Sequence, residues 1–225
     1  MGNPSAVAAP RGLNRWPLPA RVGIAFAFWL VVIAIVALFA GDLLSTALLP
    51  VIKLGAGGLL AQPLSIESLR FSSVQDVPVF ELRAVVATPW EFLNHTIPVG
   101  SNLQVTVPRA HTLYHVVVIG ALVLAWPSPN LRRRAWLLGL ACVAVVVSAL
   151  IDAPINLAAQ AHALFYERFA PAELDSSWLI RSARFLDHGG RLLLGALLAT
   201  AVIAIVAAPP RRKRRRKARR RRPAR

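Results

Sequence analysis

The chain has 225 residues, of which 56% are hydrophobic, and it carries a formal net charge of +16. Such a composition is unusual for a soluble globular domain and typical of a small multi-pass membrane protein. The single cysteine, Cys142, excludes an intramolecular disulfide and a paired-cysteine metal or redox motif. The charge is concentrated at one end of the chain, because 12 of the 26 basic residues fall within 211–225.

The first third of the chain contains two apolar stretches. Residues 1–21 are rich in Pro, Ala and Gly, which predicts a disordered cytoplasmic N-terminus. Residues 22–40 form a long apolar run that predicts an uncleaved transmembrane helix, since no good signal-peptidase site follows it. Residues 43–61 are also apolar, but Pro50, Lys53 and three glycines favour a helix lying along the outer membrane surface over a second crossing.

The extracytoplasmic segment 41–110 ends in a β-rich stretch, within 64–107. Three short segments have the alternation of half-buried strands: 65–71, 79–87 and 102–107. In the second segment, Glu81 and Arg83 lie opposite a fully apolar face formed by Phe80, Leu82, Ala84 and Val86. Three strands make a sheet that is unlikely to be stable alone, so we expect it to rest on the outer helix or on a partner.

A hairpin of two apolar runs, 111–127 and 135–151, determines the predicted orientation. Each run is just long enough to cross a bilayer as a helix. The turn between them, 128–134, ends in three arginines: Arg132, Arg133 and Arg134. Because arginine-rich short loops stay on the side of synthesis, this turn is expected to be cytoplasmic.

The last third of the chain predicts a second outer segment and a final span. Asp152 and Pro154 suit a helix start, and residues 152–190 are expected to form extracytoplasmic amphipathic helices. Residues 191–208 predict the fourth transmembrane helix, and 209–225 predict a disordered polybasic cytoplasmic tail. All ten acidic residues fall in the two segments assigned to the outside.

Together these patterns predict a mainly α membrane protein. It would have four transmembrane helices, a small extracytoplasmic β element and interfacial amphipathic helices. Both termini would lie in the cytoplasm, and the compact Ala- and Arg-rich composition favours the inner membrane of a bacterium.

Polar residues at the outer ends of the spans are the candidate site residues. His111 and His115 are four residues apart, which places both on one helix face as two metal ligands would require. The alternative is that these histidines only lie where polar side chains still reach water. Arg109 and Asp152 fall at similar depth, and we expect them to pair and position helices, as Arg191 would with Asp187. No cofactor is predicted.

The basic clusters predict contact with anionic lipid headgroups, which attract cations near a membrane surface. RNA or an acidic protein partner is the alternative ligand for the tail, although no aromatic residue is interleaved for base stacking. The residues expected to contact lipid or an anionic partner are Arg132, Arg133, Arg134, Arg211, Arg212, Lys213, Arg214, Arg215, Arg216 and Lys217.

The layout over roughly 22–208 resembles the small membrane proteins associated with exosortases, particularly the exosortase H-associated type. The shared features are an N-terminal anchor, an apolar outer segment with a few strands, the Leu113-Tyr114 entry to a span, an arginine-rich inner turn and a last span. The resemblance implies an accessory to protein sorting and carries no site residues over. Cys142 lies mid-span without a matching Arg or His, so the chain does not resemble the exosortase enzymes themselves.

The sequence therefore favours a non-enzymatic scaffold or accessory that docks a membrane-protein partner through 62–109 and 155–188. The alternative function is an outward-facing metal or small-solute binding or transport protein that uses His111 and His115. An enzyme is the third hypothesis, and no nucleophile motif such as G-x-S-x-G supports it.

Overall fold

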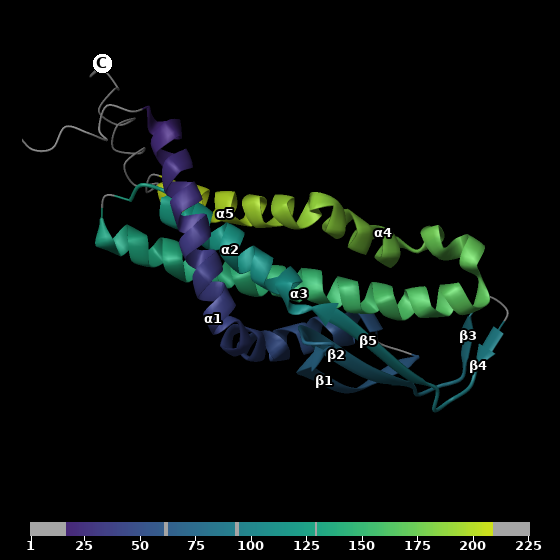
Figure 1. The fold of residues 1–225 in the computed structure, drawn as a ribbon. Helices are drawn as coiled ribbons and strands as arrows, with labels where there is room; N and C mark the ends of the chain where they lie inside the picture. Colours follow the sequence, from purple (N-terminus) through teal and green to yellow (C-terminus); the bar gives the residue numbers. More distant parts are fainter. Residues whose placement is uncertain (1–16, 61–62, 93–94, 129, 209–225) are drawn as a thin grey trace, which may run out of the picture.

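A computed structural model describes residues 17–60, 63–92, 95–128 and 130–208. The chain is mainly helical, with a small sheet inserted between the first two helices (Figure 1). In chain order the elements are α1 (Leu18–Leu60), β1 (Leu64–Val74), β2 (Val77–Val86), β3 (Trp90–Phe92), β4 (His95–Ile97), β5 (Asn102–Pro108), α2 (Arg109–Ala125), α3 (Leu131–Phe169), η2 (Pro171–Ser176), α4 (Trp178–Phe185), η3 (Leu186–Gly190) and α5 (Arg191–Ala207).

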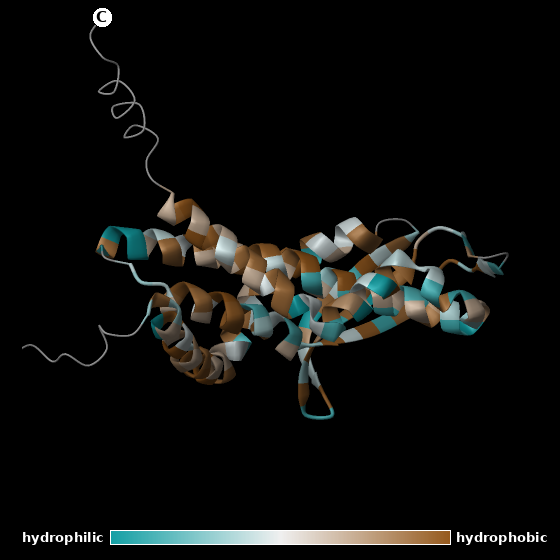
Figure 2. Cartoon of the chain, turned by 90° about the horizontal axis from the view of Figure 1, so that it is seen from above, coloured by the Kyte–Doolittle hydropathy of each residue, from teal (hydrophilic) through white to brown (hydrophobic). Residues whose placement is uncertain are grey.

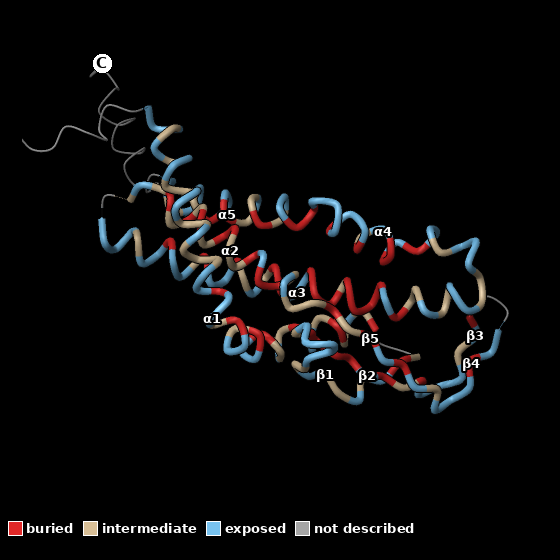
Figure 3. The backbone as a smooth tube through the Cα atoms, viewed as in Figure 1, coloured by how far each residue is buried: buried red, intermediate tan, exposed pale blue. Residues whose placement is uncertain are grey.

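Three helical segments are long and apolar enough to cross a membrane: α1, α3 and the continuous stretch Trp178–Ala207. Hydrophobic residues dominate these helices, whereas hydrophilic ones are more frequent around the sheet (Figure 2). The first half of α1 is mostly exposed (Figure 3), including Phe28 at 59% and Phe39 at 88%. Large apolar side chains so exposed need lipid around them. The apolar α2 has 17 residues, and its crossing stays a prediction.

The first helix differs from the sequence-based expectation. A span over 22–40 and a separate surface helix over 43–61 were expected, but α1 is one helix of 43 residues with Pro50 inside it. Figure 1 shows that α1 changes direction along its length, and a proline is a common cause of such a bend. The second half of α1 remains helical because one face of it is buried in the core beneath the sheet, through Leu48, Ile52, Ala56 and Leu60.

The three predicted strands form one antiparallel sheet of order β1-β2-β5. The apolar face predicted on β2 is buried, and Leu82 pairs with Val105 of β5 in the same core. The sheet rests on the second half of α1 and on α3. The sequence left open whether the outer helix or a partner supports the sheet. In the structure, the helix supports it. The strands β3 and β4, which were not predicted, form a separate hairpin.

The helix that differs most from the prediction is α3, which runs without a break from Leu131 to Phe169. The predicted helix start at Asp152 and Pro154 is wrong, because both residues lie inside the helix. Its 39 residues span about 58 Å, roughly twice the hydrocarbon thickness of a bilayer. The outer half of α3 therefore continues beyond the predicted span 135–151 and supports the sheet on one side and α4 on the other (Figure 1).

Gly55 explains how α3 accommodates a proline. Pro154 has no N–H, so the carbonyl of Leu150 lacks its usual partner within the helix. A Cβ added at Gly55 would lie 2.5 Å from Pro154 Cγ and 2.8 Å from the Leu150 oxygen. The second half of α1 thus approaches α3 at this point because Gly55 has no side chain. Gly55 therefore has a packing role.

The chain between α3 and α5 turns back along α3. The amphipathic α4 buries Leu179, Ile180 and Ala183. The helical backbone is interrupted in η3, where Gly189 has a φ of +109° that favours glycine. α5 follows over almost the whole of the predicted span 191–208.

Candidate functional site

A buried polar cluster joins α2, α3 and α5 at the point where η3 turns into α5. Its centre is Asp152, which is fully buried, as is His115. We call it the Asp152 cluster; its members are His111, His115, Asp152, Asn156, Asp187 and Arg191. Ionisable side chains buried within membrane helices are costly, so such a cluster is the first candidate for a functional site.

Each helix contributes two members of the cluster four residues apart. α2 provides His111 and His115, α3 provides Asp152 and Asn156, and the turn from η3 into α5 provides Asp187 and Arg191. Residues four apart lie on the same face of a helix, so each helix presents one polar stripe to the other two. The sequence pattern therefore predicts the pairs within each helix but not their meeting.

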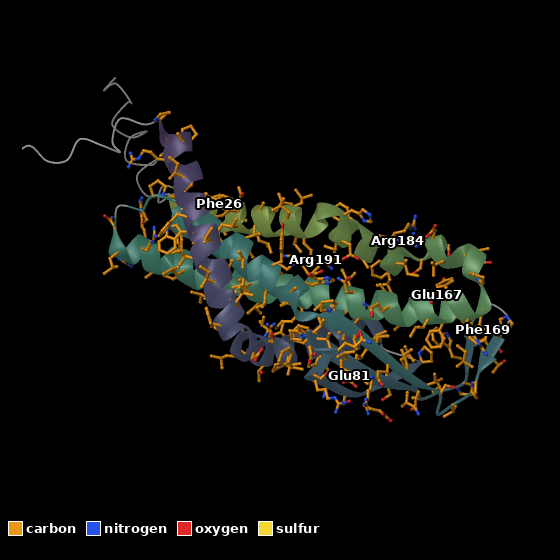
Figure 4. All side chains as sticks on the ribbon, in the orientation of Figure 1. Phe26, Glu81, Glu167, Phe169, Arg184 and Arg191 are labelled. Atoms are coloured by element: carbon orange, nitrogen blue, oxygen red, sulfur yellow. The ribbon has the colours of Figure 1, made fainter. Side chains whose placement is uncertain are left out.

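Arg191 connects the most members of the cluster. Its Nε donates to both carboxylate oxygens of Asp152, at 3.1 Å and 3.0 Å. One terminal nitrogen donates to Asp187, and the other to Asn156 Oδ1 at 3.1 Å and to His111 Nδ1 at 2.9 Å. Figure 4 shows Arg191 between α5 and α3. Each nitrogen of this guanidinium therefore has an acceptor, as a buried cation requires.

The hydrogen bonds also fix the two histidine tautomers. Arginine can only donate, so His111 Nδ1 accepts and His111 is neutral with its proton on Nε2. His115 Nε2 lies 3.0 Å from Asp152 Oδ2, where it donates to the carboxylate. His115 Nδ1 is buried without a hydrogen-bond partner in the described part of the chain, and it faces Gly195 of α5.

Asn156 completes the environment of Asp152. Its amide nitrogen donates to Asp152 Oδ1 at 2.8 Å and to the Asp152 backbone carbonyl at 2.9 Å. The carboxylate therefore receives hydrogen bonds from three side chains, those of His115, Asn156 and Arg191. Two carboxylates, those of Asp152 and Asp187, thus share the guanidinium of Arg191. Chemically, the cluster can lock three helices together and can pass a proton between Asp152 and His115.

The predicted pair of Arg109 and Asp152 is wrong, because each residue has a different partner. Arg109, at the first position of α2, forms its ion pair with Asp42 of α1. Gly41 makes room for it, since a Cβ there would lie 3.0 Å from the guanidinium. Arg109 still links α1 to α2, and Asp152 links α3 to α2 and α5. The ion pair expected between Asp187 and Arg191 is present.

His111 and His115 lie in one cluster, but the structure does not support a metal site there. His111 Nδ1 accepts from Arg191 and His115 Nε2 is hydrogen-bonded to Asp152, so one nitrogen of each imidazole is already engaged. In the described ranges, no group of three or more His, Cys, Asp or Glu side chains is arranged to hold a metal ion. The metal hypothesis stays a prediction without a third ligand.

The arginines of the α2–α3 turn divide into two kinds. Arg132 and Arg133 are exposed and available to lipid headgroups or other anions. Arg134 donates to the carbonyls of Leu124 and Trp126, at 3.0 Å and 3.2 Å. Its charge therefore lies at the C-terminus of α2, where the helix dipole favours a cation. The predicted tail contacts lie outside the described residues: Arg211, Arg212, Lys213, Arg214, Arg215, Arg216 and Lys217.

A cleft of about 260 Å³ lies beside the Asp152 cluster, between α2 and the start of α5. We call it the Tyr114 cleft. Its polar wall is formed by His111, Asp187 and Arg191, and the rest of its lining is Ala110, Tyr114, Leu186, Gly189 and Leu192. The cleft therefore combines charged groups with an apolar floor, and it connects the cluster to the surface.

The outer face of the sheet carries a second charged cluster, around Glu81 of β2. Figure 4 shows Glu81 on this sheet. Arg70 Nε and one terminal nitrogen donate to its two carboxylate oxygens at 3.1 Å and 3.0 Å, and Arg83 Nε donates at 2.9 Å. The hydrogen bonds from Arg70 and then Arg83 lower the pKa of Glu81 from 4.5 to about 2.

An aromatic cluster fastens the β3–β4 hairpin to the outer end of α3. The Trp90 ring lies 4.7 Å from Phe165 and 6.2 Å from His162, measured between ring centroids. Phe92 packs edge-on against Tyr166 at 4.9 Å, and His95 stacks on Phe169 at 4.9 Å. Burial lowers the pKa of His162 below its usual value, so this imidazole is held in its neutral form.

Comparison of the chain with family models, with curated proteins and with solved structures gives no match. The function must therefore be argued from the geometry.

The sequence did not identify Asn156 as a site residue, and it did not predict that Asp187 and Arg191 lie in one cluster with Asp152. The spacing of four residues in each pair was the available signal. The sequence paired Asp152 with Arg109 because the two residues fall at similar depth in the membrane. Depth does not show which faces of the helices meet.

Proposed function

We propose that the protein is a membrane scaffold that presents a fixed extracytoplasmic platform for a partner protein. The platform consists of the β1-β2-β5 sheet, the outer half of α3 and α4. The observation that carries the proposal is the continuity of α3, which belongs both to the apolar bundle and to the core beneath the sheet. One stiff helix therefore couples the platform to the membrane.

Two clusters support a rigid platform. The Asp152 cluster holds α2, α3 and α5 together beneath it, and breaking such a buried set leaves an uncompensated charge. The aromatic cluster holds the β3–β4 hairpin at the other end of α3. Rigid, pre-organised surfaces bind partners with less loss of conformational entropy.

The outer face of the sheet is the surface proposed for docking. Arg70 and Arg83 are about half exposed there, although both pair with Glu81. A shallow cavity of about 400 Å³ lies beside them, lined by Glu67, Arg83 and Gln104 among others. This face carries charged and amide side chains, which suit a polar protein partner. The sequence suggested a partner because a three-stranded sheet is unlikely to be stable alone. Since helices support the sheet, the reason to expect a partner is now this exposed polar face.

The partner class follows from the family resemblance in layout: a membrane enzyme of exosortase type, at the inner membrane of a bacterium. The scaffold would act as an accessory to protein sorting without catalysing a reaction itself. Metal or solute binding at His111 and His115 is the alternative, and it is less favoured because Arg191 and Asp152 already engage those imidazoles.

Site-specific photo-crosslinking in the native host tests the docking surface. A crosslinking residue at Gln104, on the outer sheet face, is expected to give a discrete adduct with a sorting enzyme or its substrate. The matched control is Val143, an exposed apolar position of α3 that should face lipid and give no adduct. The proposal fails if Gln104 and its neighbours on the face give no adduct, or if Val143 gives the same one.

Orientation needs a separate test. Replacing Cys142 by serine gives a cysteine-free background, since the chain has no other cysteine. In this background, a membrane-impermeant maleimide should label Asp76→Cys, in the β1–β2 turn, in intact cells. Arg133→Cys should react only after the membrane is permeabilised. The reverse pattern would place the platform in the cytoplasm and remove the proposed function.

A further inference from the structure

The Tyr114 cleft has features that neither the scaffold role nor the Asp152 cluster explains. Asp187 lines the cleft and keeps 48% of its side-chain surface exposed, although it pairs with Arg191. Tyr114 is 42% exposed on the opposite helix, and Leu192 is 50% exposed below. A partly free carboxylate, an aromatic ring and an apolar floor thus line one opening.

The charge of the neighbouring cluster indicates which ligand would fit. Two carboxylates, Asp152 and Asp187, share the single guanidinium of Arg191. His111 accepts from Arg191 and is neutral, so it supplies no second positive charge. Of these two carboxylates, Asp152 is fully buried, whereas Asp187 is exposed and lines the cleft. A cation placed in the cleft would therefore give Asp187 a second counter-charge.

The other residues at the cleft restrict the chemical class of the ligand further. The face of a tyrosine ring attracts ammonium groups within about 6 Å of its centroid. The floor of the cleft continues onto the first turns of α5, where Leu192, Leu193 and Leu197 are at least half exposed. An apolar surface of this kind suits a hydrocarbon chain. The ligand would therefore carry an ammonium group above and an aliphatic chain below.

We propose that the Tyr114 cleft binds the primary ammonium headgroup of a membrane lipid of the phosphatidylethanolamine class. The ammonium lies between the Asp187 carboxylate and the Tyr114 ring, and an acyl chain follows the exposed leucines of α5. This inference is independent of the partner proposed for the sheet face. It concerns a different surface of the molecule.

Native mass spectrometry of the full-length chain, delipidated in mild detergent, tests the proposal. Phosphatidylethanolamine should be retained about tenfold more than its N-acetylated derivative, which has the same chains and phosphate but no ammonium. It should also exceed phosphatidylglycerol by a similar factor. Equal retention of all three lipids would overturn the proposal, as would a preference for phosphatidylglycerol, which would indicate recognition of phosphate. Equal binding of free phosphoethanolamine would overturn the assignment to a lipid.

Three variants tie the binding to the cleft. Asp187→Asn should lower the retention of phosphatidylethanolamine about tenfold. The control Asp175→Asn removes an exposed carboxylate that pairs with Arg184, and neither residue lines the cleft, so retention should not change. Because Asp187→Asn also alters the Asp152 cluster, Tyr114→Leu provides a second variant that leaves those charges intact. It should lower retention several-fold while Tyr114→Phe, which keeps the ring, does not. Unchanged retention in both Asp187→Asn and Tyr114→Leu would remove the site.

Discussion

Asp152 of α3 accepts a hydrogen bond from His115 of α2, with 3.0 Å between Oδ2 and Nε2, and neither side chain is exposed. Arg191 of α5 approaches the same carboxylate from the other side. Three helices thus meet at a single ionised group, and the platform above the bundle depends on this contact.

Asp152→Asn should therefore destabilise the protein strongly. The change keeps the shape of the side chain but leaves Arg191 without its main counter-charge. Breaking a buried pair in this way costs about 3–5 kcal/mol. The free energy of unfolding in mixed micelles measures the effect.

The control for that measurement is Arg184→Gln on α4, which removes one member of an exposed ion pair with Asp175. Exposed pairs contribute at most about 1 kcal/mol. Equal losses for Asp152→Asn and Arg184→Gln would mean that the Asp152 cluster does not hold the helices together.

Gly55→Ala tests the contact between α1 and α3. The added Cβ would overlap the ring of Pro154 and the Leu150 carbonyl, and these groups belong to a packed helix that cannot easily move. A loss of about 1–3 kcal/mol in the free energy of unfolding is expected from such overpacking.

Gly57→Ala is the matched control, two residues further along the same helix, where an added Cβ meets nothing within 4 Å. Since alanine favours helices over glycine by up to about 1 kcal/mol, this variant should be neutral or stabilised. A stabilised Gly55→Ala would contradict the close approach of the two helices.

Glu81→Gln should reduce the loss of stability in acid. The folded-state pKa of Glu81, about 2, lies below its usual value of 4.5, so the ionised carboxylate stabilises the folded state. That contribution is fully present above pH 4.5 and is lost as the pH falls toward 2. The melting temperature of the native protein should therefore fall more between pH 5 and pH 3 than that of Glu81→Gln. Parallel pH profiles for the two proteins would show that Arg70 and Arg83 do not stabilise the carboxylate.

Trp90→Ala should release the β3–β4 hairpin without disturbing the main sheet. Trp90 contacts rings on both β3 and α3, and such aromatic pairs contribute about 0.5–1.5 kcal/mol each. Hydrogen exchange should become faster at the described amides of β3 and β4 and stay unchanged in β2. Trp136→Ala, at a position 60% exposed on α3, serves as the control. Faster exchange throughout the sheet would mean that the hairpin is part of its core.

Local patterns in the sequence were enough to predict several elements. Alternation over 79–87 identified the buried face of β2, because neighbouring residues of a strand point to opposite sides. The apolar run at 191–208 located α5. These features depend on residues that are close in the chain.

The helix ends were harder to predict where packing opposes local preference. Pro154 was expected at the start of a helix and Pro50 within a separate surface helix, yet both lie inside longer helices, α3 and α1. In each case the helix is held by buried contacts on either side of the proline. Gly55 and Pro154 are almost a hundred residues apart, so no local pattern could reveal that they meet.

What the sequence determined by itself is which stretches are apolar, which alternate and which polar residues share a helix face, because these properties follow from the periodicity of a single element. Only the tertiary structure decided that Arg109 pairs with Asp42 and that Asp152 pairs with His115 and Arg191. The physical reason is that charges at similar depth compete for the same partners. The choice among them depends on how the helices rotate and pack, with Gly41 and Gly195 setting how closely they approach.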